Sequence, residues 1–230
     1  MHCYLTYNEL VSLASLEAIA EGPSSATVVL SHVRIEIVGS LVTAYATDRS
    51  TAARIVFSLA NEIESGEPVT WPVFTIAAAV LKKATQAAKG AHSAVRNSIN
   101  PLVRVDLLED GGVSLTVNGV DTFKSYPPKQ PGSDHVSTYP PVGRLFPNSD
   151  EHEHAIEAGL PLSVERLAAV AKLRHPDDTL TGRAATNFGG YRISRGGDAE
   201  SSPVFLSRRE ARVAVIVAPI KEQFAARGSL

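Results

Sequence analysis

One structural plan recurs three times along this chain and constrains its fold most: a short strand, an amphipathic helix, then two or three strands. The first copy is expected at residues 1–67. Asn8 is a good N-cap for a helix that continues to about Ala20, and the helix carries a buried stripe at Leu10, Leu13 and Leu16. Alternating apolar and polar residues then predict strands at residues 28–38, 41–46 and 53–59.

The second copy is expected at residues 68–147. Residues 69–72 supply its short strand, and apolar spacing predicts a helix from about Phe74 to Ala88. Three further strands are predicted at residues 102–108, 113–117 and 122–126. Residues 127–154 are rich in proline, which resists both helix and central strand, so this segment is predicted to be a connecting loop.

The third copy is expected at residues 148–230 and begins near Ala155. Ser163 caps a helix through about Leu173, whose inner face is predicted to carry Val164, Leu167, Ala168 and Ala171. Strands are predicted at residues 180–184, 191–194 and 213–217. Such units bury their apolar faces only against one another. The chain is therefore predicted to be α+β: a domain of two half-units (1–67 and 68–147, including the connector) and a third unit (148–230).

Composition agrees with a globular chain. The 230 residues are 44% hydrophobic and 20% charged, which is enough apolar material for a sizeable core. Apolar runs are far shorter than the roughly 20 residues that cross a bilayer, and the first residues lack the basic start of a signal peptide. The single cysteine, Cys3, excludes an internal disulfide. A soluble, cytoplasmic protein is expected.

Charge is distributed in blocks of alternating sign, although the chain as a whole has a formal net charge of -2. Residues 68–105 carry five Lys or Arg and no Asp or Glu, whereas residues 106–160 carry three basic and nine acidic residues. This pattern is typical of a protein with one basic face on an acidic body, and chance clustering on a solvated surface is the alternative.

Several motifs occur in an order that resembles one known family. The alternating strand His32 to Ile37 is followed by the turn Ala46-Thr47-Asp48-Arg49, and Val69 to Lys83 combines a strand, a proline and a helix with Leu-Lys. Next come Tyr139-Pro140-Pro141-Val142 with Leu145-Phe146-Pro147. The last motif is the apolar strand Ala214 to Ala218, which ends in Pro219-Ile220. In this order the motifs resemble the bacterial sliding clamp family, the DNA polymerase III beta subunits, and the chain resembles a short, divergent member.

The resemblance implies a DNA-clamp-like fold and a protein without intrinsic catalysis or cofactor. It implies a processivity factor that encircles duplex DNA without sequence preference, tethers a DNA polymerase or other replication protein, and depends on a clamp loader. It also implies that partners dock a short apolar peptide near the closing strand, around Val213 to Pro219. If a closed ring needs about twelve half-units, three units per chain suggest a homo-oligomer of four chains.

In such a clamp, Lys and Arg on the helices attract the phosphate backbone without reading bases. The first helix carries acidic residues and no Lys or Arg, so the DNA-binding candidates come from the second and third helices, with Arg49 added from the family turn. The candidates are Arg49, Lys82, Lys83, Lys89, Arg96, Arg166, Lys172 and Arg174. For each of them an ordinary solvated surface charge is the competing interpretation.

Two alternatives remain open. The first is a clamp-derived adaptor that binds protein partners and never closes into a ring. The second is a small metal-dependent hydrolase that would use His152, His154, His175 and Asp177, because imidazole and carboxylate groups are metal ligands. A proline-flanked polar loop is a poor source of rigid ligands, so no metal site is assigned. The chain has no phosphate-binding glycine loop and no Gly-x-Ser-x-Gly motif.

Overall fold

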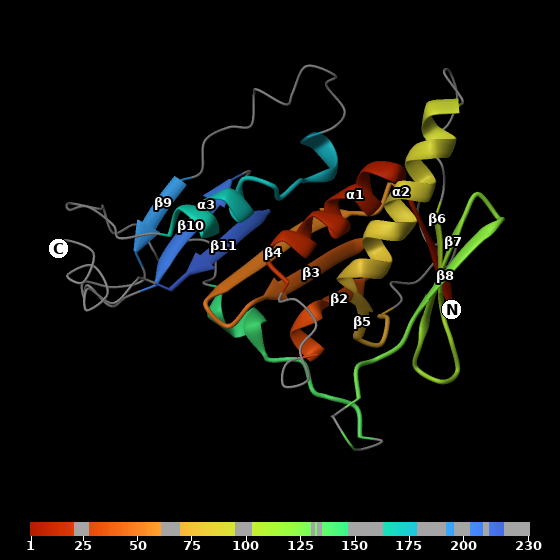
Figure 1. Cartoon of the computed structure of the whole chain (residues 1–230), viewed down its shortest axis with the longest axis horizontal. Coiled ribbons are helices and arrows are strands. Elements are labelled where there is room, and N and C mark those ends of the chain that lie inside the picture. The colour runs from red at the N-terminus through yellow and green to blue at the C-terminus, as the bar shows by residue number, and fades with distance from the viewer. Residues whose placement is uncertain are drawn as a thin grey trace.

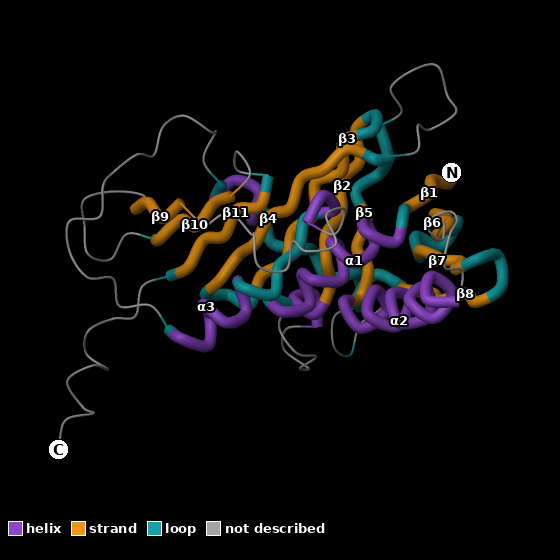
Figure 2. Tube along the Cα trace, turned by 90° about the horizontal axis from the view of Figure 1, so that it is seen from above, coloured by secondary structure: helices purple, strands orange, loops and turns teal. Residues whose placement is uncertain are grey.

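The described part of the chain forms two antiparallel sheets with helices on one side of them (Figures 1 and 2). The predicted α+β class is thereby confirmed. No helix in this part combines the length and the apolar character needed to cross a membrane. The computed structural model describes residues 1–20, 28–60, 70–94, 103–129, 132, 135–146, 163–178, 192–195, 203–208 and 212–218.

The segment predicted as the first half-unit begins with β1 (His2–Leu5) and α1 (Tyr7–Ser15), which continues into a 3-10 turn at Leu16–Ala18. The helix is capped by Thr6, not by Asn8 as predicted. The side chain of Thr6 accepts from the Glu9 backbone N–H at 3.2 Å, and Glu9 Oε2 accepts from the Thr6 N–H at 2.6 Å. This reciprocal pair is a capping box, which satisfies two otherwise unpaired donors. The strands β2 (His32–Val38), β3 (Leu41–Thr47) and β4 (Thr51–Ser58) follow.

The segment predicted as the second half-unit contains β5 (Phe74–Ala77), α2 (Ala78–Ala94), β6 (Val103–Leu107), β7 (Val113–Val117) and β8 (Asp121–Ser125). The prediction that the helix begins near Phe74 is wrong, because residues 74–77 form the strand β5 and the helix begins at Ala78. Residues 74–77 alternate buried and half-buried positions and pair with β2, with Ile35 opposite Phe74. A helical stripe and an edge strand share these apolar residues, and pairing with β2 decides in favour of the strand.

The two half-units exchange their first strands. One sheet has the order β1-β6-β7-β8, so β1 lies beside a strand of the second half-unit, with Cys3 opposite Val105. The other sheet begins β5-β2-β3-β4, so β5 lies beside a strand of the first half-unit. Each half-unit therefore completes the sheet of the other, and α1 packs beside α2 across them.

The third region consists of α3 (Val164–Val170), a 3-10 turn at Pro176–Asp178, and the strands β9 (Arg192–Arg195), β10 (Val204–Arg208) and β11 (Val213–Val217). Its strands extend the second sheet to the order β5-β2-β3-β4-β11-β10-β9. Strand β10 is absent from the sequence prediction, and the predicted strand at 180–184 lies outside the described residues. The seam is regular: β11 pairs with β4 antiparallel, and the Ala218 N–H donates to the Ser50 carbonyl at 2.8 Å.

The predicted inner face of α3 is wrong. Val164 is 80% exposed and Leu167 is 40% exposed, whereas Val170 and Leu173 are buried. This short helix carries two apolar stripes, and the sheet takes the second of them. Periodicity alone identifies a stripe but does not say which of two stripes the core will cover.

Two clusters of buried residues lie on opposite faces of the larger sheet. On the helix side, alternate strand residues such as Ala44, Ile55 and Val215 belong to the main core. On the other side lies a smaller group, here called the outer cluster: Tyr45, Ala52, Tyr139, Val142, Phe146, Ala214 and Ile216. Three of its members come from the proline-rich connector, so residues 139–146 pack on the sheet. The prediction of a simple connecting loop misses this packing.

Candidate nucleic-acid interface

The helices α1, α2 and α3 lie on the same side of the two sheets, so their outward faces form one continuous surface (Figure 2). Several predicted DNA-binding residues are exposed on it. Lys82, Lys83 and Lys89 project from α2, and Lys172 follows α3. Arg96, which was predicted to join them, lies outside the described residues.

The lysines of α2 are not equivalent. Lys82 Nζ lies 2.8 Å from Glu17 Oε1, and both side chains are about half exposed. Within the part of the chain that is described, Lys83 and Lys89 form no ion pair. A carboxylate in contact with Lys82 offsets its charge toward a polyanion, so Lys83 and Lys89 contribute more of the positive potential.

The acidic residues of the first helix do not all face outward. Glu9 is only 2% exposed: its Oε2 accepts from the Thr6 backbone and side chain, and its Oε1 accepts from the Ala60 N–H at 2.7 Å. Glu17 is paired with Lys82. Glu21 lies outside the described residues. Glu9 and Glu17 are therefore both engaged in contacts within the chain, and they repel DNA less than the sequence suggests.

The two arginines predicted to bind DNA from the third region also donate hydrogen bonds to backbone carbonyls of the chain itself. Arg166 is half-buried, and its Nη1 donates to the Ala218 carbonyl at 2.8 Å, which joins α3 to the end of β11. Arg174 Nη1 donates to the Ala171 carbonyl at 3.3 Å. Lys172 is exposed and makes no such contact within the described chain. Of the three, Lys172 is the best placed to meet a phosphate.

Arg49 occupies the turn between β3 and β4. Its backbone has φ of 77°, a left-handed conformation that is uncommon for a residue with a side chain. Asp48 holds this turn, because its Oδ1 accepts from the Ser50 N–H at 3.0 Å and from the Thr51 N–H at 2.6 Å. The Arg49 side chain is exposed.

Beside this turn lies a hollow of about 560 Å³ between the end of α1, the turn and α3. Asp48 and Glu165 line it together with Arg166, so both signs of charge are present. The hollow therefore lacks the uniformly positive lining that a phosphate site needs.

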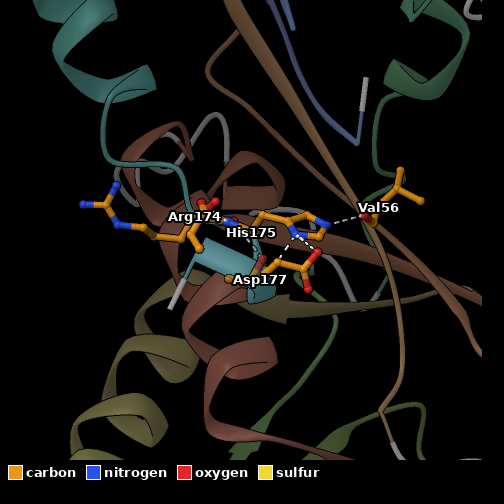
Figure 3. A network of polar contacts seen from close by, with 6 residues as sticks. Val56, Arg174, His175 and Asp177 are labelled. Carbon is orange, nitrogen blue, oxygen red and sulfur yellow. Dashed lines mark hydrogen bonds and ion pairs between the residues drawn. The ribbon is translucent and has the colours of Figure 1, made fainter. Parts of the chain in front are cut away.

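A polar network fixes the third region to the first domain at the sheet seam (Figure 3). His175 is 2% exposed; its Nε2 donates to the Val56 carbonyl at 3.0 Å and its Nδ1 accepts from the Asp177 N–H at 3.3 Å. Its backbone N–H donates to Asp178 Oδ2 at 2.7 Å. Nearby, Ser12 Oγ donates to the Arg174 carbonyl at 2.8 Å.

These contacts bear on the metal-site alternative. Both ring nitrogens of His175 bond to protein groups, and the side chain is buried. Among the described residues no group of three or more His, Cys, Asp and Glu is close enough to hold a metal ion. His152 and His154 lie outside the described residues.

The outer cluster forms a second surface feature, on the face opposite the helices. Tyr139 Oη donates to the Tyr45 carbonyl at 3.3 Å, and burial raises the pKa of the Tyr139 hydroxyl well above its usual value. The Arg54 guanidinium lies 5.0 Å from the centre of the Phe146 ring, a cation–π geometry. Leu145 is 56% exposed beside this cluster. An apolar side chain thus projects next to the seam of β4 and β11.

The solved structures that match this chain share one fold. No family model and no curated protein matches the sequence. The DNA polymerase sliding clamp from Bacillus subtilis matches with a TM-score of 0.60 and 14% identity, over 96% of this chain and 64% of that chain. The DNA polymerase III beta subunit from Thermotoga maritima matches with a TM-score of 0.57 and 14% identity, over the same shares. The Helicobacter pylori beta clamp bound to DNA ligase peptide matches with a TM-score of 0.55 and 12% identity, over 96% and 66%.

The chain therefore has the fold of the sliding clamps, as its motifs predicted. It spans just under two thirds of the length of these clamps. The sequence also failed to reveal two features of the site: the His175 network at the seam, and the outer cluster. Both join residues far apart in the chain, and the only sequence signals for them were Tyr139-Pro140-Pro141 and the apolar closing strand.

Proposed function

We propose that this protein is a sliding-clamp-like processivity factor that surrounds duplex DNA and has no catalytic activity of its own. One observation carries the proposal: a single sheet runs across β4 and β11 from the first domain into the third region, with α1, α2 and α3 on one face (Figure 2). A sheet lined by helices can form the wall of a channel, and the helices then face the contents of the channel.

The charge on that face supports the proposal. Lys83, Lys89 and Lys172 are exposed, and they make no ion pair within the described chain. Scattered lysines bind phosphates through weak, sequence-independent contacts, which permit sliding. An enclosing ring retains DNA by topology, so strong contacts are unnecessary. The ring is proposed to form from several copies of the chain in the cytoplasm, loaded by a clamp loader.

The decisive experiment compares circular with linear DNA. Protein is mixed with nicked circular plasmid, so that subunits can assemble around the duplex, and bound protein is separated by gel filtration at a salt concentration that abolishes ordinary phosphate binding. A ring remains on the circle and is released when a restriction nuclease linearises the plasmid. Equal retention on both forms, or none on either, would overturn the proposal.

Tethering of a partner is proposed to use the opposite face. The outer cluster and the exposed Leu145 lie at the seam of β4 and β11, beside the closing strand at Val213–Val217. A short apolar peptide could dock there while DNA occupies the helix face. The Helicobacter pylori clamp is bound to a DNA ligase peptide.

A fluorescently labelled peptide of this kind is the probe for the docking site. Its affinity, measured by fluorescence anisotropy, should weaken about tenfold in the variant Leu145→Asp. The control variant is Val136→Asp, at an equally exposed site on the connector, and it should bind the peptide as the wild type does. Equal binding by both variants would move the docking site elsewhere.

We also propose the domain organisation predicted from the repeats: two half-units at residues 1–67 and 68–147, then a third unit at 148–230. Limited proteolysis with mass spectrometry tests these boundaries, since exposed connectors are cut first. The adaptor alternative predicts the same peptide binding without retention on circular DNA. The two functions are therefore separated by the plasmid experiment.

A further inference from the structure

The helix α3 exposes an apolar stripe. Val164 is 80% exposed and Leu167 is 40% exposed, and the exposed Ala168 and Ala171 complete the i, i+3, i+4, i+7 spacing of one helix face. The sheet is covered by a different stripe, which contains Val170 and Leu173. A row of apolar side chains along a helix that already has a buried face indicates a second contact surface.

The stripe points away from the rest of the molecule. Glu165, Arg166 and Ala169 line the hollow that α3 shares with the end of α1. Residues two positions apart on a helix are separated by about 200°. Leu167 and Ala171 each lie two positions from Ala169, so the exposed stripe lies on the side of α3 opposite the first domain.

The seven-stranded sheet ends with an unpaired strand edge on the same outer side, as far as the described residues go. Strand β9 pairs with β10 along one edge, and no strand within the described chain pairs with its other edge. It is the last strand of the seven-stranded sheet and lies at the end of the molecule in Figure 1. Unpaired strand edges are normally covered or blocked.

The first domain shows what covers these features when a unit is complete. There α1 packs beside α2 of the other half-unit, and the edge of β2 is covered by β5, also from the other half-unit. In sheet order, β9, β10 and β11 correspond to β2, β3 and β4, because β11 and β4 meet at the seam. The third region therefore has the helix face and the strand edge of a half-unit, and no second half covers them within the described residues.

We infer that a second copy of this chain covers the exposed stripe of α3, so that the third regions of two copies form one complete domain about a two-fold axis. This contact is isologous, because the same surface serves both partners. In an antiparallel pair of α3 helices, the exposed Glu165 at the start of one helix lies beside the exposed Lys172 at the end of the other. Both residues lie on the flank of the stripe that borders the hollow, so the surface is complementary to itself. The inference rests on the proposed self-association and names the surface that makes it.

The first test measures mass by light scattering over a dilution series. Wild-type protein should form at least a dimer. Leu167→Asp should raise its dissociation constant about tenfold or more. Val164→Asp should do the same without harming the helix, because a carboxylate is favourable in the first turn. Val136→Asp, at an exposed site on the connector, is the matched control and should leave the mass unchanged. A wild-type monomer, or a dimer indifferent to both α3 variants, would overturn the inference.

The second test traps the contact. Ala168→Cys should form a disulfide-linked dimer under mild oxidation, because the two-fold axis brings this residue close to its own copy. The native Cys3 gives little background, since it is 3% exposed and burial raises the pKa of its thiol to about 12. Val136→Cys is the control. Equal cross-linking of both variants would contradict the assignment of the surface.

The plasmid experiment separates this inference from the proposed function. Dimers that depend on Leu167 but are not retained on circular DNA leave the inference intact and reject the clamp. Retention on circular DNA that is indifferent to Leu167→Asp supports a ring and rejects this surface.

Discussion

The first domain and the third region are built from the same kinds of elements but differ in closure. In the first domain each half-unit donates a strand to the other, and the apolar faces of α1 and α2 are buried against the two sheets. In the third region α3 covers the sheet with Val170 and Leu173 and leaves its other apolar stripe exposed. This difference shows that a half-unit of this fold buries its outer strand and its helix face where a neighbouring half-unit supplies a second strand and helix.

The largest effect on stability should come from a substitution in the main core of the first domain. Leu81 on α2 is completely buried, and Leu81→Ala should lower the free energy of unfolding by about 3 kcal/mol, through lost burial and the cavity left behind. Val164→Ala, on the exposed stripe of α3, should change it by less than about 0.5 kcal/mol in dilute protein. Urea denaturation measures both. A large loss for Val164→Ala at monomer concentrations would mean that the stripe packs within its own chain.

The seam between the two regions should give the next largest effect. His175→Ala removes the donor to the half-buried Val56 carbonyl and leaves that group without this hydrogen bond, at a cost of about 2 kcal/mol. The amide protons of β11 should exchange faster than those of β6, because the variant loosens the third region first. Hydrogen exchange with mass spectrometry measures this difference. His135→Ala, at an exposed site, is the control, and uniform acceleration in both sheets would argue that the chain opens as one unit.

Lowering the pH should weaken the first domain through His32. Burial lowers the pKa of this imidazole below its usual 6.5, although hydrogen bonds to backbone carbonyls of Val28 and Tyr126 oppose the shift. A lowered pKa in the folded state means that the unfolded chain binds the proton more readily. The contribution of His32 to stability is therefore complete above pH 6.5 and is lost as the pH falls through 6.5 toward the lower pKa of the folded state.

Urea midpoints between pH 8 and pH 5 test this sign. His32→Asn should flatten the slope in that range, and we expect a smaller change than for His175→Ala. An unchanged slope would show that another group dominates the titration.

Local sequence patterns predicted much of the first domain and little of the third region. The stripe of Leu10, Leu13 and Leu16 and the strands β2 and β3 follow from spacing that tertiary contacts reinforce. The start of α2 could not be predicted, because Phe74 fits both a helical and a strand periodicity and only its pairing with β2 decides. The inner face of α3 could not be predicted, because the helix carries two apolar stripes and only packing decides which one is buried.

The candidate site shows the same limit. Lysine positions on α2 followed from helical spacing, but the pairing of Lys82 with Glu17 joins residues 65 positions apart. The burial of Glu9 against the Ala60 N–H is equally non-local. Sequence patterns identify which residues share a helix face, whereas the electrostatics of that face depend on neighbours from other elements.

The smallest effects should distinguish the three lysines of α2. Lys83→Ala and Lys89→Ala should each weaken binding to duplex DNA about two- to fivefold and reduce the slope of log K against log salt by about 1. Lys82→Ala should weaken binding less, because Glu17 already offsets its charge, and Glu17→Ala should strengthen binding by freeing Lys82. Fluorescence anisotropy at several salt concentrations measures all four variants. If Lys82→Ala proved the most damaging, the ion pair would have to open on DNA, and the first helix would face the duplex more closely than Lys83 and Lys89 do.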